Sequence, residues 1–115
     1  MTDKEQPLPE TVEEVMARMP ARFNSKEGGR VKATIQFKFT GDEPGEWVAT
    51  IANGKCSTRS GTVDNPNVTI NSPSEVWLKI TRRELDGATA FISGQFSFTG
   101  DMGILMRMNS WFGSS

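Results

Sequence analysis

Hydrophobic residues occupy every second position of the segment 31–39, with lysine, threonine and glutamine between them. This period of two predicts a strand with one face packed inward and the other facing water. A second strand, 47–52, ends at Asn53-Gly54, the strongest short hairpin signal. A third strand, 55–62, is almost wholly polar and suits a sheet edge, where charges oppose edge-to-edge pairing. Together the three segments predict an antiparallel meander.

Helical spacing of apolar residues begins before the meander. Val12, Val15, Met16 and Met19 recur at this spacing after a capping box of Thr11 and Glu14. We expect Pro20 to kink or restart this first helix, because proline removes a helical hydrogen bond.

The second half of the sequence predicts shorter elements. A strand at 68–71 is followed by a helix whose capping box is Ser72 and Glu75, with Pro73 at its first position. Asp86 caps a helix at 87–92, a final strand covers 95–99, and Asp101 caps a closing helix that runs to Phe112. Helices that cover one face of a mostly antiparallel, five-stranded sheet define the α+β class. We expect residues 1–9 to form a disordered leader and residues 10–113 a single domain.

The closing helix, 101–112, is apolar over a wider arc than is needed to cover one sheet. One stripe at helical spacing and its flank contain Ile104, Leu105, Met108, Trp111 and Phe112, with Met102 and Met106 beside them. Methionine side chains adapt to irregular shapes, so this helix predicts the soft wall of an apolar ligand cavity. A methionine-rich core that fills its own gaps is the alternative interpretation.

Composition narrows the class of partner. Thirteen basic and fourteen acidic side chains nearly cancel, which argues against nucleic acid as a partner. No apolar run approaches the roughly 20 residues that span a bilayer, and the first nine residues lack the apolar segment of a signal peptide. The last three residues are not a peroxisomal address, and the lone Cys56 excludes an intramolecular disulfide. We therefore expect a cytoplasmic protein.

The absence of two residue types limits the chemistry. The chain contains no histidine and no tyrosine. This excludes serine–histidine and cysteine–histidine nucleophiles, histidine-ligated zinc and the commonest general base. We expect a protein that is not an enzyme and that needs neither a cofactor nor a metal.

Several turn and packing motifs occur in an order that resembles the sterol carrier protein type 2 family, in a free-standing microbial form. They are Gly45-Glu46-Trp47, Asn53-Gly54-Lys55, the run from Asp64 to Ile70, Leu85-Asp86, the run from Ala90 to Gly94, Phe96, Phe98 and Gly100-Asp101-Met102-Gly103. The resemblance extends from about Val12 to Phe112. It implies an elongated hydrophobic tunnel between sheet and helices, and nonspecific binding of sterols, fatty acids, acyl-CoA esters or phospholipids.

The resemblance assigns the function to the tunnel lining, because the family has no catalytic residue to transfer. The implied lining is Ile35, Phe37, Phe39, Trp47, Ile51, Trp77, Ile80, Phe91, Phe96, Phe98, Met102, Leu105, Met106, Met108 and Trp111. We expect an apolar small-molecule ligand, at most transient membrane contact, and a monomer or weak dimer. The alternative hypothesis is a non-catalytic accessory or assembly module that docks a partner protein through the apolar C-terminal helix.

Overall fold

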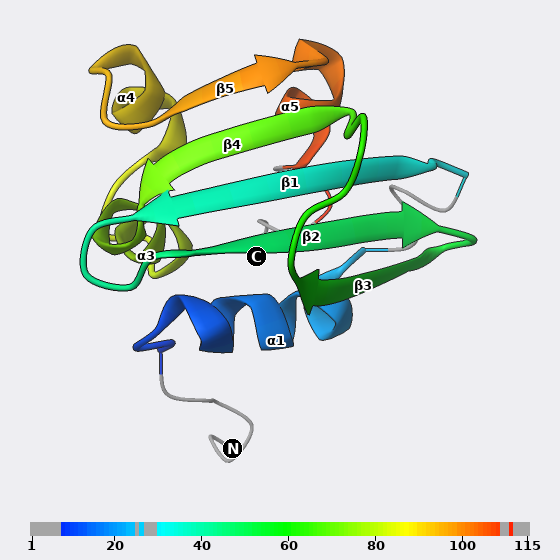
Figure 1. The fold of residues 1–115 in the computed structure, drawn as a ribbon, viewed down its shortest axis with the longest axis horizontal. Coiled ribbons are helices and arrows are strands. Elements are labelled where there is room, and N and C mark those ends of the chain that lie inside the picture. The colour runs from blue at the N-terminus through cyan, green and yellow to red at the C-terminus, as the bar shows by residue number, and fades with distance from the viewer. Residues whose placement is uncertain (1–7, 25, 27–29, 109–110, 112–115) are drawn as a thin grey trace.

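The computed structural model describes residues 8–24, 26, 30–108 and 111, and contains one five-stranded sheet. Its strands are β1 (Ala33–Thr40), β2 (Gly45–Ala52), β3 (Lys55–Ser60), β4 (Val68–Pro73) and β5 (Ser97–Gly100). They lie in the order β3-β2-β1-β4-β5, and only the β1–β4 pair is parallel (Figure 1). The predicted meander and the mostly antiparallel sheet are confirmed.

Within the described residues, four helices pack with this sheet. They are α1 (Val12–Arg22), α3 (Ser74–Thr81), α4 (Gly87–Ile92) and α5 (Met102–Met108). α1 packs against β3 and α3, α5 contacts β4, and α4 lies at the end of the sheet beside β5 (Figure 1). The α+β class is therefore confirmed. The first seven residues of the expected leader, and positions 109, 110 and 112 of the expected closing helix, lie outside the described residues.

The register between the strands explains which residues form the core. Phe37 of β1 lies opposite Trp47 of β2 and Ile70 of β4, and Ile35 occupies the equivalent position one pleat earlier. Directly paired residues point to the same side of a sheet, so the alternating apolar residues of three strands gather on one face. Ile35, Phe37 and Ile70 are completely buried there.

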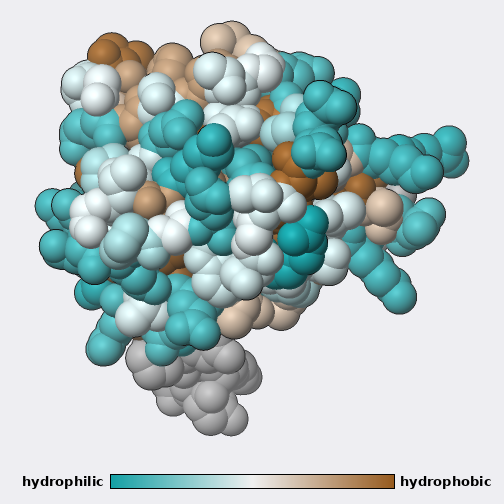
Figure 2. All heavy atoms as spheres, in the orientation of Figure 1, coloured by the Kyte–Doolittle hydropathy of each residue, from teal (hydrophilic) through white to brown (hydrophobic). Residues whose placement is uncertain are grey.

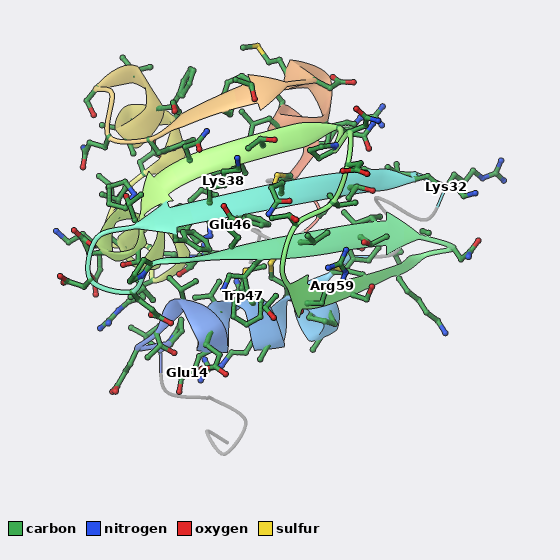
Figure 3. The ribbon with its side chains drawn as sticks, in the orientation of Figure 1. Glu14, Lys32, Lys38, Glu46, Trp47 and Arg59 are labelled. Atoms are coloured by element: carbon green, nitrogen blue, oxygen red, sulfur yellow. The ribbon has the colours of Figure 1, made fainter. Side chains whose placement is uncertain are left out.

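The opposite face of the sheet is crossed by the β3–β4 connection, residues 61–67 (Figure 1). Gln36 fixes this connection: its Nε2 donates to Gly61 O (3.0 Å) and Trp47 O (3.1 Å), and its Oε1 accepts from Val63 N (2.9 Å). The period-two pattern placed Gln36 on the water-facing side, yet its side chain is buried, because the connection covers it. Lys38 and Glu46, paired in register on this face, remain exposed (Figure 3).

Pro20 does not restart the first helix, since α1 runs without interruption from Val12 to Arg22. Proline lacks the N–H that would bond to the carbonyl four residues earlier, here Met16 O. The hydroxyl of Thr58 on β3 donates to that carbonyl instead, at 2.9 Å. A side chain from the sheet thus replaces the hydrogen bond that the sequence of the helix removes.

The start of α3 also differs from its prediction. β4 continues to Pro73 because that residue pairs with Thr40 of β1, so the helix begins at Ser74 and Ser72 is a buried strand residue. Glu75 accepts from the Asp42 amide (3.3 Å) and the Ser74 hydroxyl (3.2 Å) rather than closing a capping box with Ser72.

The β1–β2 loop provides a cap that the sequence did not indicate. The Glu43 carboxylate accepts from the amides of Val12 (2.6 Å) and Glu13 (3.0 Å) at the start of α1. The Glu43 amide donates to Ser74 Oγ (2.9 Å) at the start of α3. A loop remote in sequence therefore holds the first turns of two helices together.

Three local caps agree with the predictions. Thr11 Oγ1 accepts from Glu14 N (3.1 Å), and Asp86 accepts from Thr89 N (2.9 Å) at the start of α4. Asp101 accepts from Ile104 N (3.3 Å) at the start of α5. The reciprocal bond of the first capping box is different, because the Glu14 carboxylate accepts from Glu10 N instead of Thr11 N.

Candidate functional site

The structure divides the fifteen residues of the predicted tunnel lining into three groups by exposure. Seven are buried: Ile35, Phe37, Phe39, Ile51, Phe96, Met108 and Trp111. Five are half-buried and pack against this core: Trp47, Trp77, Ile80, Phe98 and Leu105. The remaining three, Phe91, Met102 and Met106, are exposed. Most of the predicted set thus lies in one apolar layer between the sheet and the helices.

Aromatic rings form a continuous line through this layer. Trp77 of α3 lies at the middle, with its ring centroid 5.6 Å from Phe37 and 5.7 Å from Phe96. Phe91 of α4 continues the line outward, at 5.7 Å from Phe96 and 5.3 Å from Phe98. Such centroid separations are those of rings in direct contact. The line connects a fully buried residue of the central strand to an exposed residue beside the last strand.

Helix α5 faces this layer with the residues that the sequence stripe predicted. Ile104 and Leu105 are half-buried against the core and Met108 is buried, whereas Met102 and Met106 lie on the opposite, exposed side. A separate aromatic pair holds the chain after α5. Trp111 is buried, its ring centroid is 6.3 Å from that of Phe23, and its carbonyl accepts from Asn24 N at 2.7 Å.

Exposed apolar side chains flank both ends of β5. We call Phe91, Ile92, Met102 and Met106 the apolar edge, with exposed fractions of 38%, 83%, 54% and 69%. In Figure 2 apolar atoms appear at the end of the molecule formed by α4 and in a second group right of centre, and polar colours dominate the rest of the visible face. Ile92 was not among the predicted site residues. The signal for it was its place in a stretch with almost no charged residues.

Of the ionisable groups of the described residues, the Cys56 thiol lies within the apolar layer. None of the described inward-facing strand positions carries a carboxylate. Burial raises the pKa of the Cys56 thiol to about 11, so the thiolate that would act as a nucleophile is scarce near neutral pH. Hydrogen bonds from the backbone amides of Glu75 itself and Asp42 lower the pKa of the Glu75 carboxyl, which is exposed.

The described residues offer neither a metal site nor a membrane-spanning helix. They contain no group of three or more histidine, cysteine, aspartate or glutamate side chains arranged to hold a metal ion. They also contain no helix with the length and apolar character needed to cross a membrane. The apolar layer and the line of rings are the candidate site, because apolar surfaces attract apolar groups by dispersion and exclusion of water.

Comparison with known sequences gives one family and one curated relative. The sequence model of the SCP-2 sterol transfer family matches residues 16–113. Hydroxysteroid dehydrogenase-like protein 2 of Xenopus tropicalis is 26% identical over 103 residues, which are 89% of this chain and 25% of the relative. The chain thus spans about a quarter of the length of that protein.

Solved structures share the fold. The palmitated SCP2L2 of Aedes aegypti is 20% identical with a TM-score of 0.69, and the match covers 86% of this chain and 87% of that one. The sec-alkylsulfatase Pisa1 from Pseudomonas sp. is 21% identical with a TM-score of 0.77, and the match covers 100% of this chain but only 17% of the enzyme. The same fold therefore occurs both in a chain of similar size and as one part of a large enzyme.

Proposed function

The chain belongs to the SCP-2 sterol transfer family, and from this premise we propose that it binds apolar lipids such as fatty acids or acyl esters and transfers them within the cytoplasm. Membership of the family supports lipid binding or transfer as the general function. The observation that carries the more specific proposal is the line of aromatic rings from buried Phe37 to exposed Phe91. A hydrocarbon chain lying beside this line would meet apolar surface from the exterior of the molecule to its interior.

Transfer of hydrocarbon out of water is sufficient to hold such a ligand. Each methylene group removed from water contributes about 0.8 kcal/mol, so a long acyl chain gains roughly ten kcal/mol or more before costs. Loss of translational and rotational freedom offsets part of this gain. Binding therefore needs neither a catalytic residue nor a charged group within the layer.

Ring contacts restrict where the acyl chain lies. Since Trp77 touches both Phe37 and Phe96, the ligand lies beside the line of rings, in a tunnel between them and the inward side of α5. Leu105 and Met108 of α5 face this layer. Methionine rotates about three side-chain bonds, so Met108 can move aside to make room for ligands of different shape. A palmitated relative with the same fold supports fatty acids as the ligand class.

Leu105 provides the test of ligand binding. Replacing it with arginine places a charge beside the proposed path, and we expect affinity for a fluorescent fatty acid to fall by at least about tenfold. The Met106→Arg variant, on the exposed side of α5, should retain the melting temperature while weakening uptake to a smaller extent. Leu105→Met, which conserves volume, is the matched control and should bind like the original chain.

Native mass spectrometry with solvent extraction completes this experiment. We expect the purified protein to release lipid. If the original chain neither releases lipid nor shifts the fluorescent fatty acid, the proposal is wrong. If the loss of fatty-acid uptake in Leu105→Arg is matched by a large fall in melting temperature, the residue only packs the core.

A second candidate function is an accessory module that docks a partner protein through α5. It is favoured by the enzymes that contain a similar part, Pisa1 and the dehydrogenase-like relative. It also has a surface available, because Met102 and Met106 are exposed. Sedimentation at low and high concentration tests self-association through this helix. A chain that is monomeric and carries lipid at both concentrations favours the lipid-carrier function over the docking module.

A further inference from the structure

The strand β5 forms one edge of the sheet, and its outer side meets no other strand of the described chain (Figure 1). The Asp101 amide donates to the carbonyl of Asn67 at 2.9 Å, which extends the β4–β5 register by one pair. Because the bonding direction alternates along an antiparallel strand, the residues two and four positions earlier also bond toward β4. The N–H and C=O groups of Phe98 and Gly100 therefore point away from the sheet, and no described residue bonds to them.

The two edge strands differ in how they are protected from further pairing. Helix α1 packs beside β3, and Lys55 and Arg59 lie on that strand. Charged side chains and a covering element are the usual means of keeping an edge strand from pairing. Residues 87–100 carry no ionisable side chain and no proline, so the sequence of β5 offers no such obstacle. Only its length of four residues limits what this edge can bind.

The side chains of β5 are complementary to the same strand of a second copy. In an antiparallel pair with its two-fold axis at Thr99, Phe98 of each copy lies opposite Gly100 of the other. This register pairs all the outward backbone groups of both strands. A ring that covers a glycine across a strand pair compensates for the missing side chain. Gly100 requires such cover, because an added Cβ at this position would collide with the carbonyl of Asn67.

Charge also favours a second copy as the occupant of this edge. In the same register Thr99 meets Thr99 of the other copy, and directly opposed threonines stabilise a strand pair. Asp101 lies opposite Ser97 of the other copy, so the two aspartates do not face each other. An acidic or basic partner would find no counter-charge on β5.

We propose that two copies of this chain associate through β5, with Thr99 at the two-fold axis, so that the two five-stranded sheets become one continuous sheet. The inference goes beyond the carrier function and does not depend on it, because it rests on the outward backbone groups of β5. Four strand residues give a small interface, and small interfaces belong to weak, transient complexes. Monomer and dimer therefore exchange, and their ratio depends on concentration.

Sedimentation equilibrium of the full chain over a wide range of concentration tests this proposal. We expect a dimer whose affinity falls by about fivefold or more in Thr99→Lys, because like charges then meet at the axis. Mixing Thr99→Lys with Thr99→Glu should restore association, since opposite charges meet in the mixed dimer. Thr50→Lys, which changes an exposed threonine on the same face of β2, is the matched control and should dimerise like the original chain. All three variants should retain the melting temperature, because both positions are exposed.

Amide hydrogen exchange locates the contact within the dimer. At high concentration the amides of Phe98 and Gly100 should exchange more slowly, whereas the Thr99 amide, which bonds toward β4, should not change. A chain that is monomeric at every attainable concentration, or a dimer that Thr99→Lys leaves intact, would overturn the inference. A dimer that is lost in Met106→Arg but kept in Thr99→Lys would assign the association to α5 and would overturn it as well. Fatty-acid binding is measured on the monomer, so none of these outcomes decides the carrier function.

Discussion

The helices at the two ends of the sheet, beside the edge strands β3 and β5, are held in different ways. At the β3 end, α1 is fixed by side chains from other elements: Thr58 satisfies its internal carbonyl and Glu43 caps its start. At the β5 end, α4 and α5 are short and leave Ile92 and Met106 in solvent. Regions with fewer tertiary constraints open at lower free energy, and binding regions are drawn from them. The comparison indicates that tertiary hydrogen bonds hold the helix at one end, while the helices at the other end leave apolar side chains exposed.

The largest loss of stability is expected at Phe37, where the line of rings begins. Phe37→Ala removes a fully buried ring that contacts Phe39 and Trp77, and should reduce the free energy of unfolding by about 3–5 kcal/mol. Phe91→Ala, at the exposed end of the same line, should cost less than about 1 kcal/mol. Denaturant unfolding measures both. Equal losses would show that the two ends are equally constrained and would remove the contrast.

An intermediate effect is expected at the side chain that compensates for Pro20. Thr58→Val leaves the Met16 carbonyl without its donor and should reduce stability by about 1–3 kcal/mol. Pro20→Ala restores an N–H to the helix, so the same Thr58→Val change should cost less in that background. A double-mutant cycle by denaturant unfolding gives the coupling. Additive losses would mean that the hydroxyl does not replace the helical hydrogen bond.

The smallest effect is expected at the cap of α4, at the accessible end. The Thr89 amide, followed by the Thr89 hydroxyl, lowers the pKa of Asp86 below its ordinary value of 3.8. The unfolded chain therefore binds the proton more tightly, so the cap stabilises the fold above that pH and is lost as pH falls through the lowered pKa. Asp86→Asn should flatten this part of the profile of melting temperature against pH. If the two proteins give parallel profiles, groups other than Asp86 cause the loss of stability at low pH.

Much of the fold could be predicted because local patterns and tertiary pairing agree. The alternation in 31–39 is produced by a strand with one buried face, and Asn53-Gly54 lies at the predicted hairpin, with positive φ at both residues. Asp86 and Asp101 cap helices through bonds that span three residues, so the sequence contains both partners. Most of the predicted tunnel lining was found in the apolar layer for the same reason, since period and register assign faces.

The remaining features depend on residues far apart in the chain. Nothing near Pro20 shows that Thr58 will donate to Met16, and nothing near Thr11 shows that Glu43 will reach the start of α1. Pairing of Pro73 with Thr40 lengthens β4 and displaces the predicted cap at Ser72. Exposure of Ile92 likewise follows from the end of the sheet at β5, which no local pattern specifies.

The buried amide of Gln36 determines which face of the sheet is left for helices. By holding the 61–67 connection across one face of the sheet, it occupies the side on which other sheets accept a second layer of helices. Among the described residues, the apolar face of the sheet is therefore the one that packs against helices, while the chain covers the other face with its own connection.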